Sequence, residues 1–384
     1  MDNIFSIISI FKRVVNDIEI NRERKLEGLH NCIPWGLPRF EQYGNPGIQK
    51  SKYYLVSANS KVGKTQITDQ LFVYNPYNFI KSTKSNIKLK IFYFSLEMSR
   101  EEKILQAISN KLYVDSKGGV RMTPTQLKSI GLKDILSSEH LNEVKSLESH
   151  FEEFEQIVTF IDDIRNPYGI YKFMRDYASH NGKQYKKKIV FESKKEDGTI
   201  VTEEKEVDDY YKPNNPDEYV IVIVDHARLI HPENGQDLWG SIAKLSSDYF
   251  VTMRNKWGYI PVLIQQQAAS QENIEHAKFD KLRPTLDGLG DNKTTQQDAN
   301  LILGLFSPFR HKISTYEGYN IQRFKDHIRF LEILGGREGG GGIVSPLFFD
   351  GAVNFFKELP LPTEEEKLLK IYGIIENLDN MKKQ

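Results

Sequence analysis

The sequence has almost no cysteine: Cys32 is the only one among 384 residues. A single thiol excludes an internal disulfide and any zinc site built from a cysteine cluster, which fits a reducing compartment. The sequence also has no excess of either charge, because lysine plus arginine and aspartate plus glutamate number 52 each. Net charge therefore gives no sign of nucleic-acid binding, which would have to come from local basic loops or a lined channel.

Long apolar runs are missing as well. The stretch from Ile4 to Phe11 is short, contains two serines and lacks a small-residue cleavage site after it. No segment reaches the roughly 20 apolar residues that span a bilayer. Hydrophobic residues make up 39% and charged residues 27%, which is ordinary for a globular chain. We therefore expect a cytoplasmic protein without membrane contact.

Short apolar segments alternate with helical ones through most of the chain. The segments with strand character are 53–58, 91–96, 156–162, 219–225, 261–266, 301–306, 328–334 and 344–350. Helices are predicted to open at Lys64 and Ser99 and to cover 166–178 and 241–257. Strands that are apolar on both faces and separated by helices are typical of a mostly parallel sheet covered on both sides. The sequence therefore predicts an α/β fold, with its main domain over residues 33–360.

The amino-terminal segment, residues 1–32, is predicted to hold a helix. Apolar residues recur there at three-to-four spacing between Ile4 and Ile18, which gives one stripe. The polar run at 21–25 either continues this helix or breaks it. The pattern leaves open whether the stripe packs on its own domain or on a neighbouring subunit.

Two further segments stand apart from the main pattern. Residues 183–216 are charge-rich around an Asp197-Gly198 turn, which predicts a protruding β-hairpin inserted in the main domain. Such an insertion is either a solvated decoration or a surface that binds a partner. Residues 361–384 carry a modest apolar stripe and are predicted to form a helical tail.

A phosphate-binding loop follows the first predicted strand. Residues 58–65 match the Walker A pattern, with alanine at the first glycine position. In such a loop, backbone N–H groups and a helix N-terminus surround the phosphates of ATP or another nucleotide. Lys64 is expected to neutralise the β and γ phosphates, and the Thr65 hydroxyl to ligate Mg²⁺. The residues predicted to contact nucleotide are Ala58, Asn59, Ser60, Lys61, Val62, Gly63, Lys64, Thr65 and Gln66.

Two carboxylates are predicted at the same edge of the sheet as this loop. Asp225 ends a strand of seven residues, so its side chain emerges at the carboxyl edge, where open α/β sheets bind ligands. We interpret it as the second metal-binding group. Glu97 follows another strand and is the best candidate for the general base that orients and deprotonates the attacking water. Alone, Glu97 would be read as a surface residue.

Two other catalytic candidates follow later strands. One of Gln265, Gln266 and Gln267 is placed to hydrogen-bond the γ phosphate, and we favour Gln266; three solvent-facing amides are the alternative. Arg337 lies in a glycine-rich loop, 335–342, that suits a guanidinium reaching across a subunit boundary. A flexible surface loop is the alternative there.

Several of these segments occur together in the order found in DnaB-like replicative helicases, whose motor is RecA-like. The sequence resembles that family over about residues 33–356. The segments that carry the resemblance are 33–65, FSLEMS at 94–99, IDD at 161–163, Asp225, RPTLDGL at 283–289, QQDANLILGL at 296–305 and GGREGGGG at 335–342. SLEM and QDAN in this order are more specific than Walker A, which many ATPases share.

The resemblance implies a ring, usually a hexamer, that hydrolyses ATP at subunit interfaces and moves 5′ to 3′ on single-stranded DNA. It assigns Lys64 and Thr65 to phosphate and metal, Glu97 to catalysis and Asp225 to Walker B. It makes Gln266 the γ-phosphate glutamine and Arg337 an arginine finger acting in trans. Segment 268–296 matches a loop facing the channel, and its basic candidates for DNA phosphates are Lys278, Lys281, Arg283 and Lys293.

The sequence departs from that family in three places. Gly335 stands where a lysine usually precedes the finger, which bears on transition-state stabilisation. His226 stands where an aromatic is common. The large collar domain has no counterpart, so its role toward a primase is not carried over, and a primase or loader is an open partner. The helix at 3–20 resembles the family's linker helix, as in a shortened phage or mobile-element type.

The resulting hypothesis is an ATP-driven helicase motor. One alternative is a RecA-like recombinase or recombination mediator, which would form filaments on DNA. A second is a nucleotide-gated scaffold or loader with weak hydrolysis, which Gly335 suggests. A small-molecule kinase fits less well, because the chain has no evident lid.

Overall fold

A nine-stranded sheet forms the centre of the molecule. The computed structural model describes residues 2–131, 135–194, 200–268, 282–289, 293–337 and 341–381. The sheet order is β13-β12-β11-β8-β1-β7-β6-β2-β3. Its strands are β1 Tyr54–Ala58, β2 Lys88–Ser95, β3 Val158–Ile161, β6 Glu218–Asp225, β7 Ile260–Gln266, β8 Leu301–Phe306, β11 Ile328–Gly336, β12 Val344–Asp350 and β13 Phe355–Glu358.

The sheet is mixed, and its larger part is parallel. Pairings among β3, β2, β6, β7, β1 and β8 are all parallel, whereas β11, β12 and β13 continue the sheet antiparallel. In the parallel part, β1, β6 and β7 are buried almost throughout, as strands covered on both faces must be. The predicted α/β class with a mostly parallel sheet is therefore confirmed.

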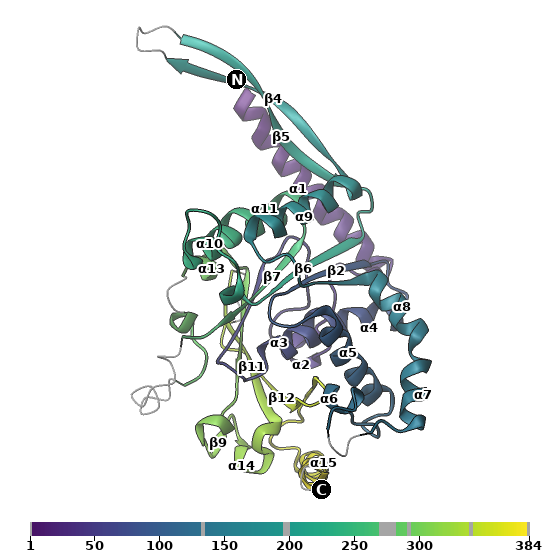
Figure 1. The fold of residues 1–384 in the computed structure, drawn as a ribbon. Helices are drawn as coiled ribbons and strands as arrows, with labels where there is room; N and C mark the ends of the chain where they lie inside the picture. The colour runs from purple at the N-terminus through teal and green to yellow at the C-terminus, as the bar shows by residue number, and fades with distance from the viewer. Residues whose placement is uncertain are drawn as a thin grey trace.

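Helices cover both faces of this sheet (Figure 1). The α-helices of the described residues are α1 Asp2–Leu26, α2 Pro38–Tyr43, α3 Lys64–Asp69, α4 Asn75–Ser82, α5 Arg100–Asp115, α6 Pro124–Leu127, α7 Ser138–Ser146, α8 Glu148–Ile157, α9 Pro167–Asn181, α10 Leu238–Lys244, α11 Val251–Trp257, α13 Lys293–Asp298, α14 Ile321–Phe324 and α15 Glu365–Met381. Helices α3, α4, α5 and α8 bury side chains against one face of the sheet. Helices α9, α10 and α11 bury theirs against the other.

Local sequence explains where several helices begin and end. Ser99 caps α5 and forms a reciprocal capping box with Glu102, so the predicted helix start is correct. Pro167 occupies the first turn of α9, where its missing N–H costs nothing. The predicted strand at 156–162 is shorter than expected, because α8 continues to Ile157.

The carboxyl-terminal helix packs on the sheet's antiparallel side. Leu368, Tyr372, Ile375 and Leu378 of α15 are buried in a third cluster. In that cluster they join Phe324, Phe330 and Phe348. The predicted helical tail is thus a helix with a covered apolar stripe. Within the described residues, no helix has both the length and the apolar character that a bilayer span requires.

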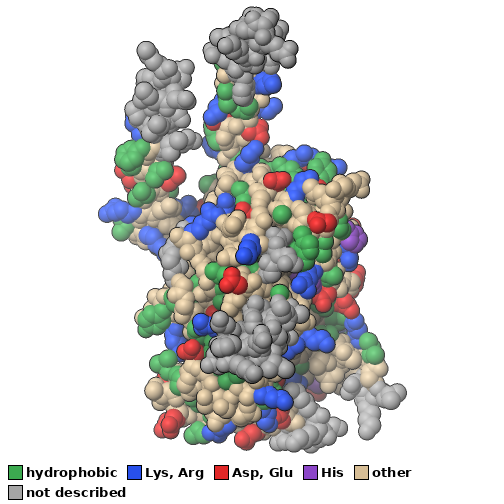
Figure 2. Space-filling view, turned by 90° about the vertical axis from the view of Figure 1, so that its left-hand side faces the viewer, with side chains coloured by type: hydrophobic (Ala, Val, Ile, Leu, Met, Phe, Trp, Pro, Cys, Tyr) green, Lys and Arg blue, Asp and Glu red, His purple; other side chains and the backbone are tan. Residues whose placement is uncertain are grey.

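Two projections leave one end of the molecule, helix α1 and the hairpin of β4 Gly182–Lys194 and β5 Ile200–Pro213. They overlap in Figure 1 but stand apart in the turned view of Figure 2. The strands pair antiparallel from Gly182↔Pro213 to Lys194↔Ile200, as the sequence predicts. The polar run at 21–25 continues α1 to Leu26.

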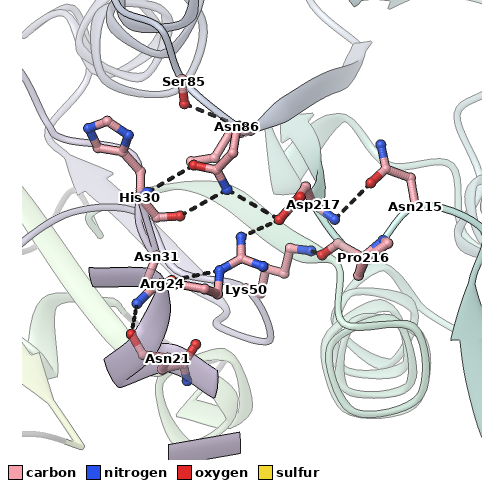
Figure 3. Close-up of polar contacts among 11 residues, drawn as sticks. Asn21, Arg24, His30, Asn31, Lys50, Ser85, Asn86, Asn215, Pro216 and Asp217 are labelled. Carbon is pink, nitrogen blue, oxygen red and sulfur yellow. Dashed lines mark hydrogen bonds and ion pairs between the residues drawn. The ribbon is translucent and has the colours of Figure 1, made fainter. Parts of the chain in front are cut away.

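A polar cluster fastens the base of α1 to the base of this hairpin (Figure 3). Arg24 forms an ion pair with Asp217, which lies between the hairpin and β6. The Asn86 side chain donates to Asp217 at 3.2 Å and accepts from the His30 backbone at 2.8 Å. Among the residues whose side chains the structure describes, the α1 contacts with the body involve Arg24 near the helix end, whereas Phe11 is 69% and Ile18 61% exposed.

Candidate nucleotide-binding site

The predicted phosphate loop connects the buried strand β1 to the N-terminus of α3. Gly63 precedes the helix with φ of +105°, a conformation that side chains rarely adopt. Lys64, at the first helical position, is 9% exposed. The Thr65 hydroxyl donates to Oδ1 of Asp225 at 3.2 Å. The two predicted metal-binding residues, 160 positions apart in sequence, are therefore neighbours.

Asp225 reaches this position because β6 lies two strands from β1 in the sheet, with β7 between them. It is 1% exposed, and the Tyr93 hydroxyl of β2 donates to its Oδ2 at 2.9 Å. The register pairs Asp225 with Ser95, two residues before Glu97. The carboxyl ends of β1, β2 and β6 thus bring Lys64, Asp225 and Glu97 to one edge.

Glu97 is the exposed member of this group. Its side chain is 54% exposed, and Oε2 lies 3.8 Å from Nε2 of His226. Burial, together with the nearby Lys64 charge, lowers the pKa of His226 to about 4, and Glu97 opposes this shift. The imidazole is therefore neutral at physiological pH, so the exposed Glu97 side chain lies beside a neutral ring.

The three consecutive glutamines have different surroundings, which strand alternation explains. Gln265 donates to the Leu289 carbonyl at 2.8 Å and accepts from Thr295 at 2.8 Å. Gln267 donates to the Ser57 hydroxyl at 2.8 Å. Both are buried and hold neighbouring segments in place. Gln266 is half-buried in register with Ala58, and no described residue hydrogen-bonds its side-chain amide.

Two arginines that sequence reasoning missed support the phosphate loop: Arg310, in the short helical turn Phe309–His311 after β8, and Arg329 in β11. Arg329 is 2% exposed, donates to the Val62 carbonyl at 2.8 Å and pairs with Asp326 at 2.9 Å. Arg310 donates to the Ser60 carbonyl. No sequence motif identifies either residue. Both reach the phosphate loop only because the sheet places β8 and then β11 beside β1.

Arg337 lies at the opposite end of the sheet from Lys64. It follows β11, whose last residue, Gly336, pairs with Leu301 at the start of β8. Leu301 also pairs with Tyr54, at the start of β1. The four residue steps of β1, about 13 Å, therefore separate Arg337 from the strand end that carries the phosphate loop. Arg337 is exposed and donates to the Gln297 carbonyl.

The predicted DNA contacts are described in part. Lys278 and Lys281 lie outside the described residues. Arg283 and Lys293 are both exposed, Lys293 at the start of α13. Arg283 interacts with the Tyr316 hydroxyl and with the charge of Glu332. Segments 282–289 and 293–298 are attached to β7 through Gln265 and Gln267.

The residues around Thr65 suit Mg²⁺. A hydroxyl and a carboxylate oxygen lie 3.2 Å apart, and Mg²⁺ prefers such oxygen donors. No cluster of three or more histidine, cysteine or acidic side chains that could hold a metal occurs in the described ranges. Mg²⁺ is usually held by one or two protein groups together with water and substrate phosphates, so the Thr65 and Asp225 pair matches its usual protein donors.

The fold is similar to solved structures of ATPase domains. One of them, described as an ATPase domain, gives a TM-score of 0.64 and 16% identity, over 90% of this chain and 99% of that one. The chain's α/β fold, with its mostly parallel central sheet flanked by helices, thus resembles that of RecA-like ATPase domains. A DnaB-like replicative helicase, solved with its interactions with primase, gives 0.63 and 17%, over 89% of this chain and 66% of that one. No protein-family model and no curated protein sequence matches this chain.

Proposed function

We propose that the chain is the ATP-hydrolysing motor of a DnaB-like DNA helicase, acting as a ring, most simply a hexamer, on single-stranded DNA. The observation that carries the proposal is that the candidate residues lie at opposite ends of the sheet's strands. Lys64, Thr65, Asp225 and Glu97 gather at one edge, and Arg337 stands at the other. A complete site for triphosphate cleavage then needs two copies of the chain, each supplying one edge.

The residues have separate tasks at such an interface. Lys64 and the loop N–H groups bind the β and γ phosphates, and Thr65 and Asp225 hold Mg²⁺, which neutralises charge on the phosphates. Glu97 orients the attacking water and accepts its proton. Arg337 of a second copy stabilises the charge that develops in the transition state.

Gln266 is proposed as the link between nucleotide and DNA. It ends β7 beside Ala58, and the chain then enters the segment proposed to face the channel. Gln265 and Gln267 donate to the Leu289 and Thr285 carbonyls, which lie in the later part of that segment. A shift at Gln266 on loss of the γ phosphate would thus reach Arg283, Lys293 and their neighbours, including Lys278 and Lys281.

Helix α1 is the proposed assembly element. Its described apolar residues Phe11, Val14 and Ile18 are exposed, and Arg24 near its end attaches it to the body, as expected for a segment that docks on another copy. A heterologous contact of this kind closes into a ring when its rotation closes. A primase or loader is proposed as a partner on the resemblance to DnaB-like helicases alone.

One experiment tests the proposal. ATP hydrolysis is measured with and without single-stranded DNA, beside unwinding of a forked duplex, over a range of protein concentrations. We expect DNA to stimulate hydrolysis and both activities to rise cooperatively with concentration. Stimulation without unwinding, with filaments on DNA, would support a recombinase instead. Nucleotide binding without hydrolysis would support a scaffold or loader.

A further inference from the structure

We propose that Tyr93 is a positioning residue for the metal-binding carboxylate of Asp225, and that a buried Lys103–Asp69 pair holds Tyr93 in place. This inference rests on the proposed Mg²⁺ site. It concerns three residues that no sequence motif marks. They come from three different elements, α3, β2 and α5.

The first step is the contact between Tyr93 and Asp225. The Tyr93 hydroxyl donates to Oδ2 at 2.9 Å, whereas the Thr65 hydroxyl donates to Oδ1 at 3.2 Å. Each carboxylate oxygen thus has its own partner. The torsion that turns a carboxylate has only broad energy minima, so without Tyr93 the longer Thr65 contact would be the remaining one of these two restraints on its orientation. The hydroxyl therefore fixes which oxygen faces the phosphate loop.

The second step is the support of Tyr93. The Lys103 ammonium lies 4.2 Å from the centre of the Tyr93 ring, a cation–π contact. The same ammonium donates to both oxygens of Asp69, at 2.6 and 2.7 Å. Asp69 also accepts from Asn354 at 2.9 Å. The tyrosine ring is thus held against a charge that is itself fixed by two carboxylate oxygens.

Burial argues that this arrangement is rigid. Tyr93 is 0% exposed, and Lys103, Asp69 and Asp225 are each 1% exposed. An ionised lysine is seldom so buried unless it is paired, and replacing such a pair by apolar residues is often neutral for stability. Stability alone therefore does not require the pair. The pair contacts Tyr93, which in turn contacts Asp225, so it is placed to orient the metal-binding carboxylate. Mutation of groups that orient metal ligands typically lowers metal affinity 10- to 100-fold.

The test compares Tyr93→Phe with Tyr54→Phe, a matched control. Tyr54 lies in β1 of the same sheet, is 1% exposed and loses one hydrogen bond, from the Gln49 N–H, when its hydroxyl is removed. Binding of a fluorescent ATP analogue is measured while Mg²⁺ is titrated, together with the Mg²⁺ dependence of hydrolysis. Tyr93→Phe should raise the half-saturating Mg²⁺ concentration about 10-fold. Its Mg²⁺-free nucleotide affinity and its melting temperature should match those of Tyr54→Phe.

A second variant tests the support, Asp69→Leu/Lys103→Met, which removes both charges together. It should fold and shift the Mg²⁺ dependence in the same direction by a smaller factor. Unchanged Mg²⁺ dependence in both variants, while Thr65→Ala abolishes the Mg²⁺ effect, would overturn this inference and leave the proposed site standing. If Thr65→Ala and the wild type respond to Mg²⁺ alike, the metal site itself is wrong and both proposals fall.

Discussion

At the carboxyl edge of β1, Lys64 and Asp225 are buried, and Asp225 accepts from two hydroxyls of its own chain. At the amino edge, Arg337 is exposed, and its guanidinium donates to a backbone carbonyl. A residue that acts in the site of its own chain can be buried and held by hydrogen bonds. A residue that acts in the site of a neighbouring copy has to be exposed. This contrast supports the proposal that the two ends of the strands supply different halves of a site shared between copies.

Two positively charged side chains, Arg254 and Arg337, lie near each other at the amino ends of the parallel strands. Burial lowers the pKa of Arg254, and the charge of Arg337 lowers it further. Arg254 is held by neutral acceptors, the Asp298 carbonyl at 2.7 Å and Asn300 Oδ1 at 3.0 Å. Asn300 also accepts the Tyr53 N–H, and its carbonyl accepts the Arg337 N–H. Repulsion between the two guanidinium groups, opposed in part by the charge of Asp298, agrees with the exposed position of Arg337.

The largest effect on ATP hydrolysis is expected from a substitution at the carboxyl end of β1. Lys64→Ala should lower ATP hydrolysis by at least about 10³-fold, because no other group replaces the ammonium between the phosphates. A steady-state phosphate-release assay measures it. Lys81→Ala, on the exposed side of α4, is the control and should keep full activity. Substantial turnover in Lys64→Ala would mean that cleavage happens elsewhere.

The next effect tests whether the two edges work together. Arg337→Ala and Glu97→Gln should each be inactive alone, because each removes one half of every site. Mixed in equal amounts, they should regain about one quarter of wild-type hydrolysis, since half of the copies supply an intact Glu97 and half an intact Arg337. The rate is measured across mixing ratios and should peak near equal amounts. Mixtures no more active than their parts would place Arg337 in the site of its own chain.

The carboxyl edge was easier to predict from sequence than its supports. Walker A and the strand-end Asp225 are local patterns, so Lys64 and Thr65 could be placed from the residues alone. Arg329 and Tyr93 act across the sheet, and only the strand order β11-β8-β1-β7-β6-β2 brings them to the loop and to Asp225. The sequence also left three glutamines open, and alternation along β7 separates Gln266 from its neighbours. Helices α7 and α8 were missed, because their patterns are short and largely polar.

A smaller effect is expected on the assembly of copies through α1. Ile18→Glu on α1 places a charge in the open stripe, so assembly should weaken by about 1.5 to 3 kcal/mol, the value of one buried isoleucine. Hydrolysis should then need a protein concentration about 10-fold higher or more. Light scattering and the concentration dependence of the rate measure this. Glu19→Gln, on the same helix, should leave both unchanged. Equal behaviour of the two variants would remove α1 from the interface.

The smallest effect is expected on the free energy of unfolding, through Lys50. This lysine lies near the amino ends of the parallel strands and has no proposed partner in another copy. Lys50 donates to the Pro216 carbonyl and lies 4.8 Å from the centre of the Tyr219 ring. Burial lowers its pKa to about 8, with Asp217 opposing the shift and Arg24 adding to it. Between pH 8 and the ordinary lysine pKa of 10.5, the unfolded chain keeps a proton that the folded chain has lost. The free energy of unfolding should therefore rise with pH in that window.

Lys50→Met should remove this slope and raise stability at pH 7 by about 1 kcal/mol, a figure reduced for partial exposure of the ammonium. Urea unfolding at pH 7 and pH 9.5 measures both quantities. Lys88→Met, at the exposed start of β2, is the control and should keep the wild-type slope. A slope that survives in Lys50→Met would assign it to another group. A loss of stability in that variant at pH 7 would mean that the Pro216 and Tyr219 contacts outweigh the cost of burying the charge, and that this edge tolerates cations for its own fold.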